Sequence, residues 1–379
     1  MGIPIFPSTV EELLCELIAR PSVSPEGEAD GSVPGESVVA DYVAGLLRGL
    51  GAEVVVNEVF AGRPNVIGRF LARRAGGPVV ALVPHLDTVG VSGMTVAPFT
   101  PGRRDGRIYG RGACDTKGPL AAALWALAEW VRGAEAADSR VTWVFAATMG
   151  EEELSVGASA LMASGFRADF AVVLEPTDLR VVRAGKGVLR VWVEAAGRAC
   201  HGSTPERGEN ALYKLLPFLA ACRDDLAPDF AARIDGDLGP ASLNVGVVAG
   251  GGELNIVPDR ARAGLDIRTH PGFANEAALA QVRAVAGGGL AVRVHREGPP
   301  FALEADHPWV RRLADHARGV ETAPWFSDAN VLNAHGTPAV AFGPGSIAQA
   351  HTRDEFIEES ALADGVRALG GFIRSISRG

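Results

Sequence analysis

The sequence predicts an α/β protein with two domains, the second of which is an α+β insertion in the first. Three observations support this prediction. With 379 residues, the chain is longer than one hydrophobic core usually supports. Up to residue 185, short apolar runs are interspersed with helical patterns, which is typical of a sheet covered by helices. At Gly185 the pattern changes to strands of alternating polarity.

The elements of the first domain follow from the spacing of apolar residues. Residues 10–19 have helical spacing after Ser8 and Thr9, which can cap a helix, and residues 36–50 form a second helical pattern that Gly51 ends. We expect a further helix at residues 120–127. We expect strands at residues 54–59, 66–71, 78–83, 141–148, 171–174 and 338–342. We expect the strands at 66–71 and 78–83 to belong to a βαβ arrangement.

The insertion is expected to span residues 186–293, between two parts of the first domain at 1–185 and 294–379. Its elements are a strand at 188–196, a helix at about 210–222 and strands at 241–248 and 260–268. This is a β-α-β-β type of order. From Arg293 onward the composition returns toward that of the first domain, which sets the boundary.

Acidic and histidine residues follow three strands of the first domain. His85 and Asp87 follow the first of three apolar runs, the glutamates at 151–153 follow the second, and Glu175 follows the third. In an open α/β sheet, sites form outside the carboxyl ends of the strands. The sequence therefore predicts a site at these positions.

Asp115 is the residue around which the candidate site is arranged. It lies in the loop YGRGACDTKGP between glycine-rich flanks and a helical run. The candidate metal ligands are His85, Asp115, Glu152, Glu175 and His351. Imidazole and carboxylate ligands suit zinc or a similar first-row divalent ion. Two such ions that share Asp115 would activate a bridging water for amide hydrolysis.

Two acidic residues have expected roles beside the ligands. Asp87 can accept the second ring N–H of His85 and fix its tautomer. Glu151 is free to take a proton from the water and to deliver it to the leaving amine. Ordinary structural explanations stay open, because the glutamates can be the solvated start of a helix and Cys114 can be a small buried residue that packs its loop.

Charge and composition argue against several classes of partner. A net charge of −9 argues against nucleic acid, because phosphate binding needs a basic face. No apolar run reaches the length of a bilayer span, and no leader pattern begins the chain, so we expect no membrane partner and a cytoplasmic location. The four cysteines are scattered along the chain, and no two of them form a CxxC motif, which suits a reducing compartment.

The order of the motifs resembles that of the M20 family of metallopeptidases and deacylases. The motifs are HLDT, GRGACDTKG, GEEE followed by SVGA, LEPT, CHGSTPERGENAL, LNVGVVAGGGELNIVPD, DIR and AHTRDEF, and they cover nearly the whole chain. Within the family, EPTDLRVVRAGKG and FGPGSIAQAHTRDEFIE look most like the acetylornithine deacetylases. The resemblance implies a zinc-aminopeptidase-like catalytic domain with a mixed sheet between helices, and two Zn²⁺ ions for which Co²⁺ can substitute.

The resemblance also assigns ligands and catalytic groups. One metal ion would be held by His85, Asp115 and Glu175, and the other by Asp115, Glu152 and His351. Glu151 matches the general base and Asp87 the orienting acid. In the family, the metal-binding Glu usually lies five residues before the Gly that corresponds to Gly157. Counting back five residues from Gly157 gives Glu152, so Glu153 receives no role.

The insertion resembles the lid and dimerisation domain of the family, which has a ferredoxin-like α+β fold. His201 matches a residue that crosses the dimer and stabilises the oxyanion in the partner's active site. Arg268 resembles the residue that grips the substrate α-carboxylate, and Asn255 resembles a nearby polar contact. From the residues alone, these two are a salt-bridged strand arginine and a turn asparagine. The family often has Ser where Gly202 stands.

Together, these assignments predict a homodimeric two-zinc amidase that acts on a small N-acyl amino acid. N-acetylornithine is the expected substrate, and arginine biosynthesis the expected pathway. Alternative activities are those of succinyl-diaminopimelate desuccinylase and of carrier-linked lysine or ornithine hydrolases. A non-catalytic, metal-stabilised binding dimer would be expected to have lost Glu151 or a ligand, and all are present. Lys117 receives no role.

Overall fold

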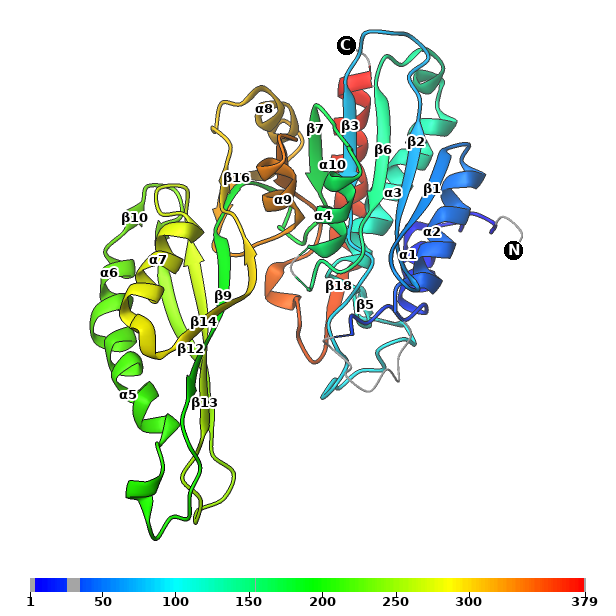
Figure 1. The fold of residues 1–379 in the computed structure, drawn as a ribbon. Coiled ribbons are helices and arrows are strands. Elements are labelled where there is room, and N and C mark those ends of the chain that lie inside the picture. The colour runs from blue at the N-terminus through cyan, green and yellow to red at the C-terminus, as the bar shows by residue number, and fades with distance from the viewer. Residues whose placement is uncertain (1–3, 26–34, 154, 378–379) are drawn as a thin grey trace. The chain divides into compact units, whose positions relative to one another are not determined.

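The computed structural model describes residues 4–25, 35–153 and 155–377, and the chain divides into two compact units (Figure 1). The first unit comprises Met1–Arg183, Leu303–Glu321 and Ser327–Gly379, and the second comprises Ala184–Ala302 and Thr322–Phe326. The second unit therefore extends beyond the expected residues 186–293. The reason is a strand, β14 (Ala291–Gly298), which pairs with the sheet of this unit.

A mixed sheet forms the centre of the first unit. Its strands, in spatial order, are β1 (Glu53–Phe60), β2 (Arg63–Phe70), β6 (Thr142–Ala147), β3 (Val79–Val83), β7 (Phe170–Val173), β17 (Ala339–Ala341) and β8 (Arg180–Gly185), and β15 (Phe301–Ala302) and β16 (Gly319–Ala323) pair with β8. β6, β3, β7 and β17 are parallel to one another. β1 is antiparallel to β2, β2 is antiparallel to β6, and β8 is antiparallel to β17 and β15. The expected mixed sheet is thus present.

The expected βαβ arrangement of the strands at 66–71 and 78–83 is wrong. β2 is antiparallel to β6, and β6 separates it from β3. A parallel crossover needs about a dozen residues or more. The connection at residues 71–78, which the structure describes throughout, is shorter and contains no helix.

Helices cover this sheet on both faces. They are α1 (Val10–Ile18), α2 (Ser37–Gly49), α3 (Lys117–Arg132), α4 (Val156–Ala163), α8 (Pro308–Ala314), α9 (Asp328–Ala334) and α10 (Glu359–Ser377). α1, α2, α3 and α10 share a core with Phe145, Phe170 and Val172. α4 and α9 pack together and against β2 and β7 respectively. Among the described residues, no helix is long and apolar enough to cross a membrane.

The second unit contains a four-stranded antiparallel sheet in the order β12-β13-β9-β14. Its elements in chain order are β9 (Gly187–Ala196), α5 (Ala211–Ala221), α6 (Ala227–Ala231), β10 (Ile234–Asp235), β11 (Gly239–Pro240), β12 (Ser242–Gly250), β13 (Arg260–Thr269), α7 (Asn275–Ala286) and β14. Val191, Val193 and Leu265 are buried in a core with residues of α5 and α7. Because successive strand residues alternate, the polar residues between them lie on the open face of the sheet.

Short elements complete the chain. The first unit has a small antiparallel sheet of β4 (Gly102–Arg104), β5 (Arg107–Tyr109) and β18 (Phe356–Glu358). Single helical turns lie at Ala134–Asp138, Pro205–Arg207, Cys222–Leu226, Gly287–Gly289 and Ile347–Gln349. The small sheet is important for the site, because it joins the segment before Asp115 to the segment after His351.

Candidate metal centre

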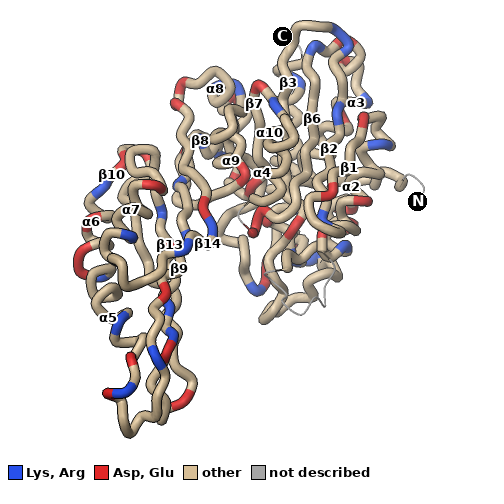
Figure 2. The backbone as a smooth tube through the Cα atoms, in the orientation of Figure 1, with Lys and Arg blue, Asp and Glu red and all other residues tan. Residues whose placement is uncertain are grey.

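The candidate site lies in the first unit, at the carboxyl ends of three adjacent parallel strands. β3 leads into His85, β6 leads into the turn at residues 150–153, and β7 leads into Glu175. Asp115 reaches the same region from the loop before α3, and His351 from the segment before β18. Figure 2 shows acidic residues of this unit grouped near α4. The fold therefore brings the five predicted ligands into one region.

Asp115 contacts both histidines, one with each carboxylate oxygen. Its Oδ1 lies 3.1 Å from Nε2 of His85, and its Oδ2 lies 3.3 Å from Nε2 of His351. Nε2 of His351 also lies 3.1 Å from Oε1 of Glu152. Ligand atoms of His85, Asp115 and Glu152 all lie within 4.8 Å of one another, a spacing in which a metal ion can be held. One carboxylate thus connects the two histidines.

Glu175 is buried, and its Oε1 has no hydrogen-bond partner among the described residues. Burial raises the pKa of Glu175 well above its ordinary value, although His85 acts in the opposite direction. A buried carboxylate oxygen without a partner costs free energy, and a cation beside it would offset that cost. This oxygen and the imidazole and carboxylate donors around it therefore fit a divalent metal ion.

The carboxylates around the two histidines favour the charged form of each ring. Burial acts to lower the pKa of His85, but hydrogen bonds with Asp115 and Asp87 outweigh it and raise that pKa well above its ordinary value. Hydrogen bonds with Asp115 and Glu152 raise the pKa of His351 to about 10. Burial acts to raise the pKa of Asp115, but hydrogen bonds with His351 and His85 hold it below its usual range. Metal binding requires neutral rings, so it would release these protons.

Asp87 positions the turn that carries the glutamates. Its two carboxylate oxygens accept the backbone N–H groups of Glu151 at 3.0 Å and Glu152 at 3.1 Å. Nδ1 of His85 lies 2.9 Å from the carbonyl oxygen of Asp87 and 3.6 Å from its carboxylate. Asp87 therefore links the orientation of His85 to the backbone of the glutamate pair.

The turn after β6 needs glycine at its start. Gly150 has a φ of 62°, and a Cβ there would lie 2.5 Å from Cγ2 of Val156. Only glycine adopts this conformation without strain. The turn places Glu152 against His351 and holds half-buried Glu151 beside it. Burial, with Glu175 nearby, raises the pKa of Glu151 well above its ordinary value.

Glu153, which received no role from the sequence, is a structural anchor of this turn. Nη1 of Arg63 donates to Oε2 of Glu153 at 3.1 Å, and Nη2 of Arg63 donates to Oε1 of Glu36 at 2.6 Å. These buried ion pairs join segments far apart in the chain. No local motif indicates them, so the sequence analysis missed Arg63 and Glu36.

Three further residues support the loops around the site. Lys117 is buried, and its Nζ donates to the carbonyl oxygen of Arg20 at 2.8 Å. Burial raises the pKa of the Cys114 thiol well above its ordinary value, which suits a packing residue better than a nucleophile. Asp328, at the start of α9, accepts a hydrogen bond of 2.6 Å from Oγ1 of Thr148. The peptide bond between Asp115 and Thr116 is cis.

The remaining candidates belong to the second unit, and there they form two groups. His201 is exposed, and the backbone N–H of Gly202 donates to the carbonyl oxygen of Asn255 at 2.7 Å. A Cβ at Gly202 would approach this carbonyl group to 3.1 Å, so a larger residue there would require a small shift of one of the two segments. Arg268 lies near the other end of β13, where its Nε donates to Oδ1 of Asp266 at 2.8 Å.

The strands keep these two groups apart. Arg268 pairs with Val188 at the start of β9, whereas His201 follows the end of β9 at Ala196. Eight residues of extended strand span roughly 25 Å. One copy of the second unit therefore holds Arg268 far from His201 and Asn255.

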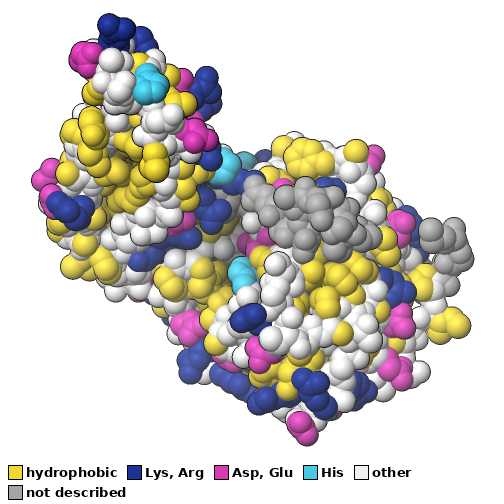
Figure 3. All heavy atoms as spheres, turned by 90° about the horizontal axis from the view of Figure 1, so that it is seen from below, with side chains coloured by type: hydrophobic (Ala, Val, Ile, Leu, Met, Phe, Trp, Pro, Cys, Tyr) yellow, Lys and Arg dark blue, Asp and Glu magenta, His cyan; other side chains and the backbone are white. Residues whose placement is uncertain are grey.

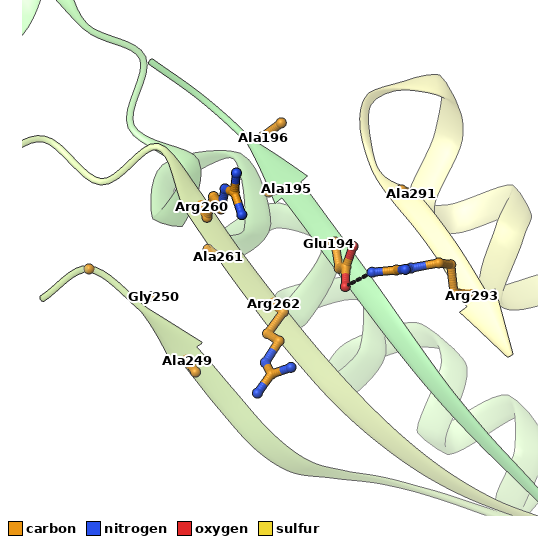
Figure 4. A pocket seen from close by; sticks show the side chains of 11 residues that line it. Glu194, Ala195, Ala196, Ala249, Gly250, Arg260, Ala261, Arg262, Ala291 and Arg293 are labelled. Atoms are coloured by element: carbon orange, nitrogen blue, oxygen red, sulfur yellow. Dashed lines mark hydrogen bonds and ion pairs between the residues drawn. The ribbon is translucent and has the colours of Figure 1, made fainter. Parts of the chain in front are cut away.

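A cavity of about 590 Å³ lies in the second unit, on its sheet (Figure 4). Its charged lining residues are Glu194, Arg260, Arg262 and Arg293, and the others are alanines and glycines. Glu194 and Arg293 form an ion pair. This cavity contains none of the predicted ligands, so it is separate from the candidate metal centre.

A mixed α/β sheet with imidazole and carboxylate groups at the carboxyl ends of its parallel strands is typical of a metal-dependent hydrolase. The chain is such an enzyme, and it belongs to peptidase family M20/M25/M40, whose family model matches residues 81–375. The expected membership of the M20 family is thus confirmed.

Relatives match over most of the chain. Acetylornithine deacetylase from Proteus mirabilis is 30% identical over 97% of this chain and 96% of its own length. The protein of the same name from Myxococcus xanthus is 32% identical over 75% of this chain and 76% of its own. The fold is similar to that of the M20 family metallo-carboxypeptidase Sso-CP2 from Sulfolobus solfataricus, with a TM-score of 0.82 at 19% identity over 98% of this chain and 100% of that chain.

Proposed function

We propose that this enzyme is a two-zinc deacylase that removes an acetyl group from the α-nitrogen of an amino acid, with N-acetylornithine as the substrate. The observation that carries the proposal is the placement of Asp115, which presents one oxygen to His85 and the other to His351. Relatives named acetylornithine deacetylase, at 30% and 32% identity, support the choice of substrate.

The residues that would hold the ions are His85, Asp115 and Glu175 for one, and Asp115, Glu152 and His351 for the other. Zn²⁺ suits this donor set, and Co²⁺ could substitute for it. Divalent ions bound there lower the pKa of water and polarise an amide carbonyl. The orphaned Oε1 of Glu175 supports this assignment, because it lacks any other partner among the described residues.

Proton transfer is assigned to Glu151. As the general base, its carboxylate takes a proton from the attacking water and gives it to the nitrogen of the leaving amine. Asp87 contributes by accepting the backbone N–H of Glu151 at 3.0 Å, which fixes the start of the side chain. Hydrogen bonds to the backbone also reduce the freedom of the turn, so the base stays oriented.

Substrate recognition is assigned to the second unit, which we propose is a ferredoxin-like lid and dimerisation domain. The guanidinium fork of Arg268 would grip the α-carboxylate, and Asp266 holds that fork in place at 2.8 Å. His201 would stabilise the oxyanion, with Asn255 as a neighbouring polar contact. Because these groups lie roughly 25 Å apart along one sheet, we infer that they serve two different active sites.

That inference requires a homodimer, and the surface of the second unit supports one. Tyr213 and Leu216 on α5, and Val247 and Val248 on β12, are exposed. Figure 3 shows hydrophobic side chains gathered on this unit. β12 is an edge strand of its sheet, and an exposed apolar edge favours pairing with another chain. We propose that two copies meet along β12 and α5, in a cytoplasmic enzyme of arginine biosynthesis.

Hydrolysis of a matched substrate panel by zinc-reconstituted protein tests the proposed activity. The panel contains N-acetylornithine, N-acetylcitrulline, N-acetylmethionine and N-succinyl-diaminopimelate. We expect the highest kcat/KM with N-acetylornithine. A preference for the succinylated compound would keep the metal chemistry but contradict the acetyl specificity, and no hydrolysis of any member would contradict the deacylase assignment.

A further inference from the structure

Glu355 is a buried carboxylate that receives four hydrogen bonds around the Asp115 loop. Its Oε1 accepts the backbone N–H groups of Cys114 at 2.8 Å and Asp115 at 2.9 Å. Its Oε2 accepts the N–H of Gly112 at 3.0 Å and Nη1 of Arg111 at 2.8 Å. The side chain is completely buried. Glu355 thus fixes the backbone of the residue that contacts both histidines.

Arg111 extends this contact to the two segments that carry the histidines. Its Nη1 donates to the carbonyl oxygen of Thr352, next to His351, at 3.3 Å. Its Nη2 and Nε donate to the carbonyl oxygen of Gly90 at 2.9 and 3.2 Å. Gly90 lies five residues after His85 in the chain. One guanidinium therefore joins all three segments.

The backbone at His351 needs such support. His351 has a φ of 61°, a left-handed conformation that residues other than glycine adopt only when their surroundings hold them there. Glu355 follows it by four residues, and β18 then pairs with β5 just before Arg111. The segment that follows His351 is thus held at Thr352 by Arg111 and at Glu355 by the backbone N–H groups of residues 112–115.

We propose that Glu355 and Arg111 are positioning residues that set the spacing among His85, Asp115 and His351 and thereby the affinity of the site for its metal ions. This inference rests on the proposed metal centre. Neither side chain is among the predicted ligands, so both act through the backbone of the loops. Loss of groups that orient metal ligands commonly lowers metal affinity 10–100-fold.

Calorimetric titration of metal-free protein with Zn²⁺ tests the proposal. Glu355→Gln keeps the size of the side chain but replaces an acceptor oxygen by an amide NH₂ group, so at least two hydrogen bonds are lost. Glu358→Gln is the matched control, because Glu358 lies three residues further along at the end of β18, where its exposed side chain forms an ion pair with Arg107 at 3.5 Å. We expect Glu355→Gln to bind at least one ion 10–100-fold more weakly than wild type, and Glu358→Gln to bind both ions as wild type does.

A second variant and a spectrum separate positioning from simple loss of folding. Arg111→Lys retains the charge but loses the fork that reaches Thr352 and Gly90, so we expect weaker binding with an unchanged far-UV circular dichroism spectrum. The visible absorption of bound Co²⁺ should also change in both variants, because it reports ligand geometry. Wild-type affinity and an unchanged Co²⁺ spectrum in both variants would overturn the proposal. Wild-type protein that binds no divalent ion would instead overturn the metal centre, and this inference with it.

Discussion

Asp115 shows how a single side chain can organise a site. Its two oxygens lie 3.1 and 3.3 Å from the two histidines, so this one carboxylate would serve both ligand groups of the proposed centre. The surrounding residues divide into groups that face the site and groups that hold its loops. Glu151 and Glu153 are two residues apart, yet the first lies beside the ligands and the second forms a buried ion pair with Arg63.

Replacement of Glu151 by glutamine should separate catalysis from metal binding. The variant keeps every predicted ligand, so we expect unchanged metal content. It loses the proton acceptor, so we expect kcat to fall by about 10²–10⁴-fold. Steady-state kinetics with metal analysis on the same sample checks both expectations. Near-normal kcat in this variant would remove Glu151 from proton transfer.

Burial of the Cys222 thiol should make the free energy of unfolding depend on pH. Burial raises the pKa of Cys222 from 9.0 to about 11, so folding disfavours its thiolate. The stability that Cys222 contributes is therefore fully present below pH 9 and is lost as the pH rises through 11. Urea unfolding at pH 8 and pH 10.5 measures this loss. Between these two pH values, the free energy of unfolding should decrease less for Cys222→Ala than for wild type. Equal decreases in the two proteins would contradict a raised pKa of Cys222.

The turn between β6 and α4 is held as one element. The side chain of Asn65 in β2 accepts the N–H of Met149 at 2.9 Å and donates to the carbonyl oxygen of Gly157 at 2.9 Å. The N–H of Gly157 also donates to the carbonyl oxygen of Met149 at 3.0 Å. Both ends of the glutamate turn are thus tied together and to the neighbouring strand.

Gly157→Ala should disturb this element. A Cβ at this position would lie 2.1 Å from the carbonyl oxygen of Met149, so the turn must move. We expect a loss of roughly 1–3 kcal/mol in the free energy of unfolding, with a lower kcat because Glu151 and Glu152 shift. Ser159→Ala, on the exposed side of α4, is the control and should change the free energy by less than about 0.5 kcal/mol. Wild-type stability in Gly157→Ala would show that the turn is not tightly held.

Elements with a local pattern could be predicted from the sequence, and long-range pairings could not. The strands that lead into His85, the glutamate turn and Glu175 are apolar runs with clear ends, so the region of the site followed from them. β14 alternates in polarity, and the sequence predicts its residues from 294 onward as part of the first domain, because no local signal indicates that it pairs with β9. The contacts of Glu355 with residues 111–115 likewise join segments about 240 positions apart, and a motif cannot report such a pairing.

At the scale of the whole molecule, the proposed roles of Arg268 and His201 imply that each active site would need two chains. The second unit carries Arg268 and His201 at opposite ends of the same two strands. In the proposed homodimer, one copy would offer Arg268 to one site and His201 to the other.

Mixing two inactive variants tests that arrangement. His201→Ala and Glu151→Gln should each be nearly inactive as homodimers, whereas a mixed dimer contains one site with both groups intact. After exchange of subunits at equal amounts, we expect activity to recover to about a quarter of wild type, because half of the dimers are mixed. No recovery after verified exchange would place His201 in the site of its own chain.

We propose that Asp115 is shared by two metal ions that the reaction needs. The most direct measurement is titration of metal-free protein with Zn²⁺, with bound metal and N-acetylornithine hydrolysis followed together. We expect activity to reach its plateau only as the second ion per chain is bound, and Asp115→Asn to lose both metal binding and activity. Full activity with one ion per chain, or two tightly bound ions in Asp115→Asn, would contradict it.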